Sequence, residues 1–278
     1  MTKTTYSLLL ATTSLVCSIS LVSFSRYATP VLAEPQPVNS LVNNVVSRSL
    51  AVGFSSPPTE GEPKESGTLG TRGGCLTDES LSPSLTPLTP GTGQGLMENQ
   101  ETVDEHPTLT VSEHPSFFVY VPKTSATTGE FILTNQQGTE EIYYISVALP
   151  ETPGIISVKL PTNLDPLEIG PVYQWSFSLQ CNNAGAAGNL TVIGWIKRTE
   201  PNPALKKDLD KVKPLELAAL YGNYGVWHDL LATLVDLRLS HPEDANLAMM
   251  WENLLQSESV KLEAISQAPL IESTPVEN

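Results

Sequence analysis

Short runs of β-branched and aromatic residues dominate the chain from Pro107 to Arg198, and turn residues separate them. The run from Val172 to Cys181 alternates apolar residues with Gln and Ser, which is the period of two expected of a half-buried antiparallel strand. These lengths and spacings predict an immunoglobulin- or fibronectin-like β-sandwich over residues 106–199. The predicted strands are Thr108–Val111, Ser116–Val121, Glu130–Thr134, Glu141–Leu149, Ile155–Leu160, Val172–Cys181 and Leu190–Arg198.

The pattern changes after Thr199 to apolar residues three and four apart, which indicates helices. Asn202 before Pro203 is a typical helix start, with Asn as cap and Pro at the first helical position. The sequence therefore predicts a mainly β protein with an α appendage: a helical region over 200–265, followed by a disordered tail over 266–278. The predicted stripes are Leu205, Leu209 and Val212; Leu217, Leu220 and Tyr221; Trp227, Leu230, Leu231, Leu234 and Leu237 or Arg238; and Leu247, Trp251, Leu254 and Leu255.

The helices around Gly225 resemble a single tetratricopeptide-type hairpin. Gly225 would permit the turn, and Pro242 would end the second helix. The spacing departs from that repeat at Ala218, which replaces a usual glycine, and at bulky Leu230 and Leu237. Since one unit cannot bury its own apolar face, we expect it to pack on the sandwich or on a partner. The residues that keep the repeat's spacing are Leu217, Tyr221, Gly225, Leu234 and Pro242.

The first 33 residues have the order of a secretory signal peptide. Lys3 is followed by the uncharged run Leu8–Phe24 and by the small-x-Ala pattern of Val31–Ala33. The run is short and rich in Ser and Thr for a membrane span. We therefore expect an exported protein, in the periplasm or the outer envelope and extracellular space, with no stable membrane span after cleavage. Residues 34–105, rich in Pro, Ser and Gly, are predicted to form a flexible arm.

The chain is strongly acidic, with 15 Lys+Arg against 30 Asp+Glu and a formal net charge of −15. Nucleic-acid phosphates would be repelled by such a chain, so we expect no nucleic-acid partner. Cys17 lies in the predicted signal peptide, which leaves Cys75 and Cys181 after export. In an oxidising compartment these two would most simply form one disulfide, and two free thiols are the alternative.

Several phrases in the chain resemble a family of exported cyanobacterial proteins of unknown function, domain-of-unknown-function family 928. The likeness covers about Gly70 to Leu262, and it implies an envelope setting but no activity and no catalytic residue. The cysteines Cys75 and Cys181 stand where that family's cysteines stand, which supports their pairing. The phrases are Arg72–Cys75, Pro115–Pro122, Leu149–Pro150, Pro153–Ile156, Gly170, Tyr173–Phe177, Leu179, Cys181, Gly194–Ile196, Pro214–Glu216, Ala219–Tyr221 and Gly225–Trp227.

Candidate chemistry is sparse. His106 and His114 flank the first predicted strand and could share a weak metal site, but a third ligand is missing, which favours surface histidines. Adjacent acids such as Glu140 and Glu141 point to opposite faces of a strand, which does not suit a glycosidase pair. We therefore predict no catalytic residue, no cofactor and no metal site, and a protein that is not an enzyme.

Exposed aromatic residues are the remaining candidates for an interaction surface, and core packing is the alternative for the two tryptophans. The first functional hypothesis is a non-catalytic envelope protein that binds an unknown envelope protein or has a structural role. The second is a carbohydrate- or cell-wall-binding module, in which Tyr143, Tyr144, Trp195 and Trp227 form a sugar-stacking platform if they are exposed. The candidate surface residues are Tyr143, Trp195, Tyr224 and Trp227.

The disulfide hypothesis predicts that the native mature protein has no titratable thiol and changes gel mobility on reduction. Closing so long a loop between Cys75 and Cys181 would contribute roughly 4–5 kcal/mol in the chain-entropy treatment. Two reactive thiols in the native protein, measured with a thiol reagent before and after denaturation, would refute the pairing.

Overall fold

The structure is a computed structural model that describes residues 51–57, 68–70, 82–91, 107–181, 189–209 and 211–276. All of them belong to one compact unit, residues 47–278. The strands are β1 Thr68–Gly70, β2 Thr86–Pro87, β3 Thr108–Thr110, β4 Ser116–Val121, β5 Thr128–Asn135, β6 Glu141–Ala148, β7 Gly154–Lys159, β8 Val172–Leu179, β9 Leu190–Arg198, β10 Leu270–Ile271 and β11 Thr274–Pro275. The helices are α2 Pro203–Asp208, α3 Pro214–Asn223, α4 Trp227–Ser240, α5 Ala245–Leu255 and the 3₁₀ turn η2 Glu263–Ile265.

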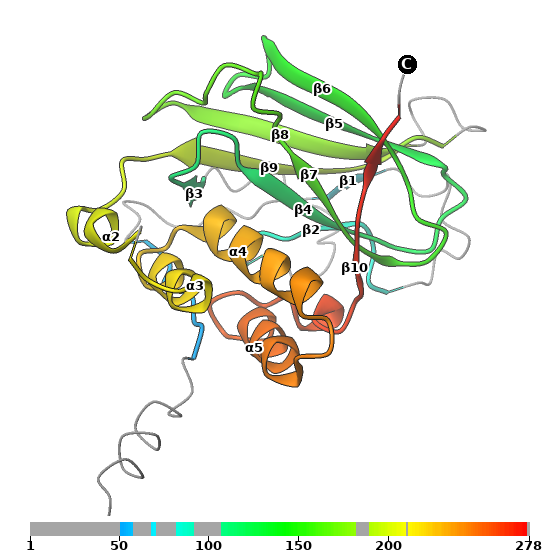
Figure 1. Cartoon of the computed structure of the whole chain (residues 1–278). Helices are drawn as coiled ribbons and strands as arrows, with labels where there is room; N and C mark the ends of the chain where they lie inside the picture. Colours follow the sequence, from blue (N-terminus) through cyan, green and yellow to red (C-terminus); the bar gives the residue numbers. More distant parts are fainter. Residues whose placement is uncertain are drawn as a thin grey trace, which may run out of the picture. The chain divides into compact units, whose positions relative to one another are not determined.

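The strands form two mixed sheets, so the mainly β prediction is confirmed (Figure 1). The large sheet has the order β1-β9-β8-β5-β6-β11, with β3 parallel to β9, and the small sheet has the order β10-β7-β4-β2. Every strand predicted from the sequence is present, and the bounds of β4 and β9 are those predicted. The immunoglobulin-like arrangement is not confirmed, since each sheet includes a parallel pair, β3–β9 and β10–β7.

Strand β4 belongs to the small sheet, which lies between the large sheet and the helices, and the strand is buried on both of its faces. Phe117, Val119 and Val121 face the core shared with the large sheet, where the Phe117 ring lies 4.8 Å from Phe131 and 5.4 Å from Trp175. Phe118 and Tyr120, one residue out of phase, pack against the helices. The helices therefore cover the outer face of the small sheet (Figure 1).

The helical region is confirmed, with Asn202 capping α2 through its side chain and Pro203 at the first position. Helices α3 and α4 form a hairpin whose turn includes Gly225 at φ 70°, the left-handed conformation that the sequence predicts there. A tetratricopeptide-type identity for this hairpin is not confirmed. Its apolar side packs on β4 and β7, which is one of the two outcomes expected for a lone helical pair.

The tail from residue 266 to 278 is predicted to be disordered, but residues 266–276 are ordered at the edges of both sheets. Leu270–Ile271 pairs with β7 and Thr274–Pro275 pairs with β6. Backbone hydrogen bonds hold it, including Ile155 N–H to Pro269 O at 2.8 Å and Val276 N–H to Ser146 O at 2.9 Å. Because these bonds use backbone atoms, a polar sequence does not prevent them.

Three segments of the predicted flexible arm, residues 51–57, 68–70 and 82–91, also pack on the domain, and residues 68–70 do so as strand β1, which pairs with β9. The rest of the predicted arm lies outside the described residues. Val52 and Leu88 are buried in the helical core, and Phe54 packs edge-on against Trp227 at 4.8 Å. The Trp227 Nε1–H donates to Leu88 O at 2.7 Å. A few apolar residues therefore suffice to order segments that composition alone assigns to a linker.

Gly222 packs closely against the segment 51–57. We therefore predict that an alanine at Gly222 lowers the stability of the protein far more than an alanine at Gly53. A Cβ at Gly222 would lie 1.9 Å from Gly53 O, whereas a Cβ at Gly53 would have no heavy atom within 4 Å. Gly222→Ala should therefore destabilise the protein by about 1–3 kcal/mol despite the higher helix propensity of alanine. Gly53→Ala is the matched control and should change the free energy of unfolding by less than about 0.5 kcal/mol. Equal denaturation midpoints for the two variants would contradict this packing.

Candidate functional site

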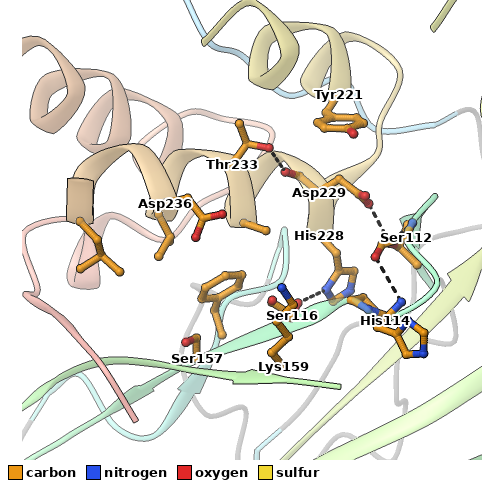
Figure 2. Close-up of a pocket in the computed structure, with 16 residues that line it drawn as sticks. Ser112, His114, Ser116, Ser157, Lys159, Tyr221, His228, Asp229, Thr233 and Asp236 are labelled. Atoms are coloured by element: carbon orange, nitrogen blue, oxygen red, sulfur yellow. Dashed lines mark hydrogen bonds between the residues drawn. The ribbon is translucent and has the colours of Figure 1, made fainter. Parts of the chain in front are cut away.

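An open cavity of about 240 Å³ lies between α4 and the small sheet, next to the segment that joins β3 to β4 (Figure 2). Its walls come from distant parts of the chain, so no local motif marks it. The polar lining residues are Thr110, Ser112, His114, Ser116, Ser157, Lys159, Tyr221, His228, Asp229, Thr233 and Asp236, and the apolar ones are Pro115, Phe118, Ala232, Val235 and Leu239.

Asp229 connects the first turn of α4 to the end of β3. Its Oδ2 accepts a hydrogen bond from Thr110 Oγ1 at 2.7 Å and one from Val111 N–H at 3.1 Å. Thr110 is fully buried and its Oγ1 also accepts from Ser112 N–H at 3.0 Å, which turns the backbone toward the cavity. A carboxylate in the first turn of a helix is also favoured by the helix dipole.

Burial raises the pKa of the Asp229 carboxyl to about 6, and the hydrogen bonds from Thr110 and Val111 oppose that rise only in part. Hydrogen bonds from the backbone N–H groups of Ser112 and of Asp229 itself also lower this pKa. Desolvation by burial is the usual cause of a raised carboxyl pKa. Burial therefore outweighs several hydrogen bonds at this carboxyl.

His228 precedes Asp229 and is held by both ring nitrogens. Nδ1 lies 3.0 Å from Ser116 O, and Nε2 lies 2.7 Å from Thr108 Oγ1. Because a carbonyl only accepts, Nδ1 carries a hydrogen, and burial lowers the pKa of the ring to about 4, so it is neutral at neutral pH. His228 therefore links α4 to β3 and β4 as a structural group.

Tyr221 and two charged side chains complete the polar part of the cavity. Burial, together with the charge of Asp229, raises the pKa of Tyr221 to about 12, so its hydroxyl stays protonated. No hydrogen bond to this hydroxyl occurs among the described residues. Lys159 on β7 and Asp236 on α4 are exposed lining residues (Figure 2).

The hydroxyl residues bonded to His114 and His228, which are Ser112 and Thr108, make their contacts within the fold. Ser112 Oγ accepts from His114 N–H at 3.2 Å, and its partner is a backbone group instead of a histidine ring. Thr108 contacts His228 but does not line the cavity. In the part of the chain that the structure describes, no three His, Cys, Asp or Glu side chains gather closely enough to hold a metal ion.

The structure places the predicted surface residues mostly in the interior. Trp195 and Trp227 are both buried, and Trp227 packs in the helical core. Tyr143 is half-buried against the core between the sheets, and half-buried Tyr224 borders the helical core in the α3–α4 turn. Together these four residues do not form one surface.

Cys181, one of the two cysteines of the predicted disulfide, is buried two residues after the end of β8. Cys75 lies outside the described residues. His106 also lies outside them, so the two-histidine site is not described, while His114 lines the cavity. The sequence analysis did not identify Asp229, Tyr221 or Thr110. A usable signal was the pair His228–Asp229 directly after the buried Trp227, because two ionisable residues at the start of an otherwise apolar helix face require partners.

These observations define a class of two-sheet β protein with a helical layer and an open polar cavity beneath it. The family model described as Domain of Unknown Function (DUF928) matches residues 67–270, so the chain belongs to that family. The family resemblance noted from the sequence is thereby confirmed. No curated protein and no solved structure matches the chain. Within the described ranges, no helix has the length and apolar character needed to cross a bilayer.

Asp229→Asn tests the electrostatics of the cavity through stability. The pKa of Asp229 is raised from 3.8 to about 6 in the folded state. Ionisation of Asp229 therefore destabilises the fold above pH 6, and this effect disappears below pH 3.8, where the carboxyl is protonated in both the folded and the unfolded state. Asparagine keeps an oxygen for Thr110 and Val111 without the charge. We expect the variant to be more stable than the wild type by about 1–3 kcal/mol at pH 8, with the difference shrinking toward pH 4.

Urea denaturation at several pH values measures this difference, and Asp236→Asn, at an exposed lining position, is the control. The control should change the free energy of unfolding by less than about 0.5 kcal/mol. His228 has the opposite effect on stability over nearly the same pH range. Because its pKa is lowered in the folded state, the wild type loses stability as the pH falls from 6.5 to about 4. Only the difference between wild type and Asp229→Asn is therefore diagnostic, and a difference independent of pH would contradict the raised pKa.

Proposed function

We propose that this chain is an exported, non-catalytic envelope protein, and that a protein partner binds at the cavity beside α4. The observation that carries the proposal is the open cavity of about 240 Å³, whose lining combines the exposed charged side chains of Lys159 and Asp236 with the exposed apolar side chain of Leu239. A concave surface that offers apolar contacts and a few polar groups is the usual form of a binding site. Export, the disulfide between Cys75 and Cys181 and an immunoglobulin-type sandwich are parts of the same proposal.

The hydrogen bonds of His228 and Asp229 favour a binding site over a catalytic site. His228 uses both nitrogens to hold Thr108 and Ser116, and Asp229 uses Oδ2 to hold Thr110 and Val111. Groups engaged in this way join elements of the fold and do not activate a nucleophile. They make the cavity a preformed receptor.

Exposed apolar side chains on the helices support a protein as the partner. Leu239, which lines the cavity, is 43% exposed, and Met249 on α5 is 55% exposed. Methionine is common at binding surfaces because its flexible, polarisable side chain adapts to the partner. Leu239 therefore offers a partner an exposed apolar contact at the cavity.

A capture experiment with crosslinking tests this function. Mature wild-type protein should retain a partner from envelope extracts, and Asp236→Arg, which reverses a charge of the cavity lining, should reduce the recovery of that same partner at least about tenfold. Glu258→Arg is the control, since Glu258 is exposed and does not line the cavity. Recovery of the bare monomer alone, or equal recovery by both variants, would count against the proposal.

A carbohydrate- or wall-binding module is the second candidate, and one observation favours it. Tyr144 is 41% exposed on the outer face of the large sheet, and its hydroxyl donates to Glu130 Oε1 at 2.9 Å. Gln180 also donates to Glu130, so an aromatic ring lies beside a row of polar groups, as sugar binding requires. The mature protein should then bind to immobilised wall polysaccharide, and Tyr144→Ala should abolish this binding. That result would favour this function over protein binding.

A further inference from the structure

We infer that the α3–α4 hairpin is a docking surface for an extended segment of another protein, and that residues 51–57 of this chain occupy it as an internal ligand. The docking surface consists of Gly222, Gly225 and Trp227. None of these three residues lines the cavity beside α4, so the inference goes beyond the function proposed for that cavity.

The segment 51–57 has the burial pattern of a bound peptide. Val52 is buried and Phe54 is half-buried, whereas the residues on either side of each are exposed. Such alternation is the pattern of an extended chain with one face against the protein. The segment belongs to neither a helix nor a strand, and Figure 1 shows it in blue beside α3.

Two apolar side chains anchor the segment. The Phe54 ring packs edge-on against Trp227 at 4.8 Å, and Val52 joins the helical core. Trp227 is fully buried, and its Nε1–H donates to Leu88 O at 2.7 Å, so the ring that receives Phe54 is fixed in place. A buried aromatic contact of this kind supplies much of the binding energy in protein interfaces.

The backbone of the segment lies directly on the hairpin. Ser55 N–H donates to Gly222 O at 3.0 Å, near the end of α3. A Cβ at Gly222 would lie 1.9 Å from Gly53 O, and a Cβ at Gly225 would lie 2.9 Å from Ser55 O and 2.8 Å from Pro57 Cγ. The segment therefore fits only where the hairpin has no side chain.

Gly222 is best explained by this docking. Gly225 has a φ of 70° and is already required by the turn, but Gly222 is not among the glycines with a positive φ. Glycine inside a helix costs up to about 1 kcal/mol relative to alanine, so its presence in the last turn of α3 needs another reason. The close approach of the Gly53 backbone supplies that reason.

The surface and the segment are separate parts of the chain. The hairpin lies within the family-matched range 67–270, and the segment 51–57 lies outside it. A second copy of the chain would bring the same segment and gain no contact over the internal one. The occupant that replaces the segment is therefore a different protein, with two apolar side chains at alternate positions, the second of them aromatic.

The test supplies the segment as a separate peptide to the mature chain. The probe is a capped, fluorescein-labelled peptide of residues 51–57, and binding is followed by fluorescence anisotropy. The double variant Val52→Ser, Phe54→Ser of the chain frees the docking surface. We expect it to bind the peptide saturably and at least about tenfold more tightly than the wild type, where the tethered segment competes at an effective concentration on the order of millimolar.

Matched controls separate the anchors from the rest of the segment. A peptide with Phe54→Ser should bind the double variant at least about tenfold more weakly, because it lacks the aromatic anchor. Ser56 is exposed, so Ser56→Ala in the peptide should leave binding unchanged, and Ser56→Ala in the chain should behave as the wild type. Circular dichroism checks the fold, and Phe54→Ala replaces the double variant if the latter does not fold.

The inference is overturned if the folded variant does not bind the peptide saturably, if the wild type binds it equally well, or if the peptide with Phe54→Ser binds as tightly. A wild-type dimer that the double variant converts to a monomer, measured by light scattering, would overturn the assignment to a different protein. The dependence of partner capture on Asp236 is measured separately, so the two proposals fail independently.

Discussion

One carboxylate oxygen joins the helical layer to the sheets. Asp229 Oδ2 accepts from Thr110 at the end of β3 and from Val111 just beyond it, and the neighbouring His228 adds bonds to Thr108 and Ser116. These contacts fix the start of α4 over the small sheet and hold open the cavity beside it. Because the same burial raises the pKa of Asp229, ionisation of the group that connects the layers costs free energy in the folded state.

The layers themselves depend on strand β4, which has apolar residues on both faces. Its odd-numbered positions, such as Phe117, meet the large sheet, and its even-numbered positions, such as Phe118, meet the helices. An ordinary half-buried strand could not support a second layer on its other face. The run Ser116–Val121 therefore explains why a lone helical hairpin, which cannot bury its own apolar side, is stable on this protein.

Periodicity predicts the local elements of this protein well but says little about its long-range contacts. The alternation through Val172–Leu179 and the stripe from Trp227 to Leu234 follow from burial on one face, so β8 and α4 were predictable. The pairing of Thr274–Pro275 with β6 was not, because backbone hydrogen bonds leave no hydrophobic pattern. The link from Thr110 to Asp229 joins residues 119 positions apart, and nothing in the neighbouring sequence of either one marks it.

The account depends most on the state of Asp229, and a ¹³C NMR titration of its side-chain carboxyl measures that state directly. The account predicts a midpoint near pH 6 in the folded wild-type protein, because burial outweighs the hydrogen bonds from Thr110 and Val111. A midpoint at or below the ordinary value of 3.8 would show that hydrogen bonding outweighs burial at this carboxyl, which contradicts the account.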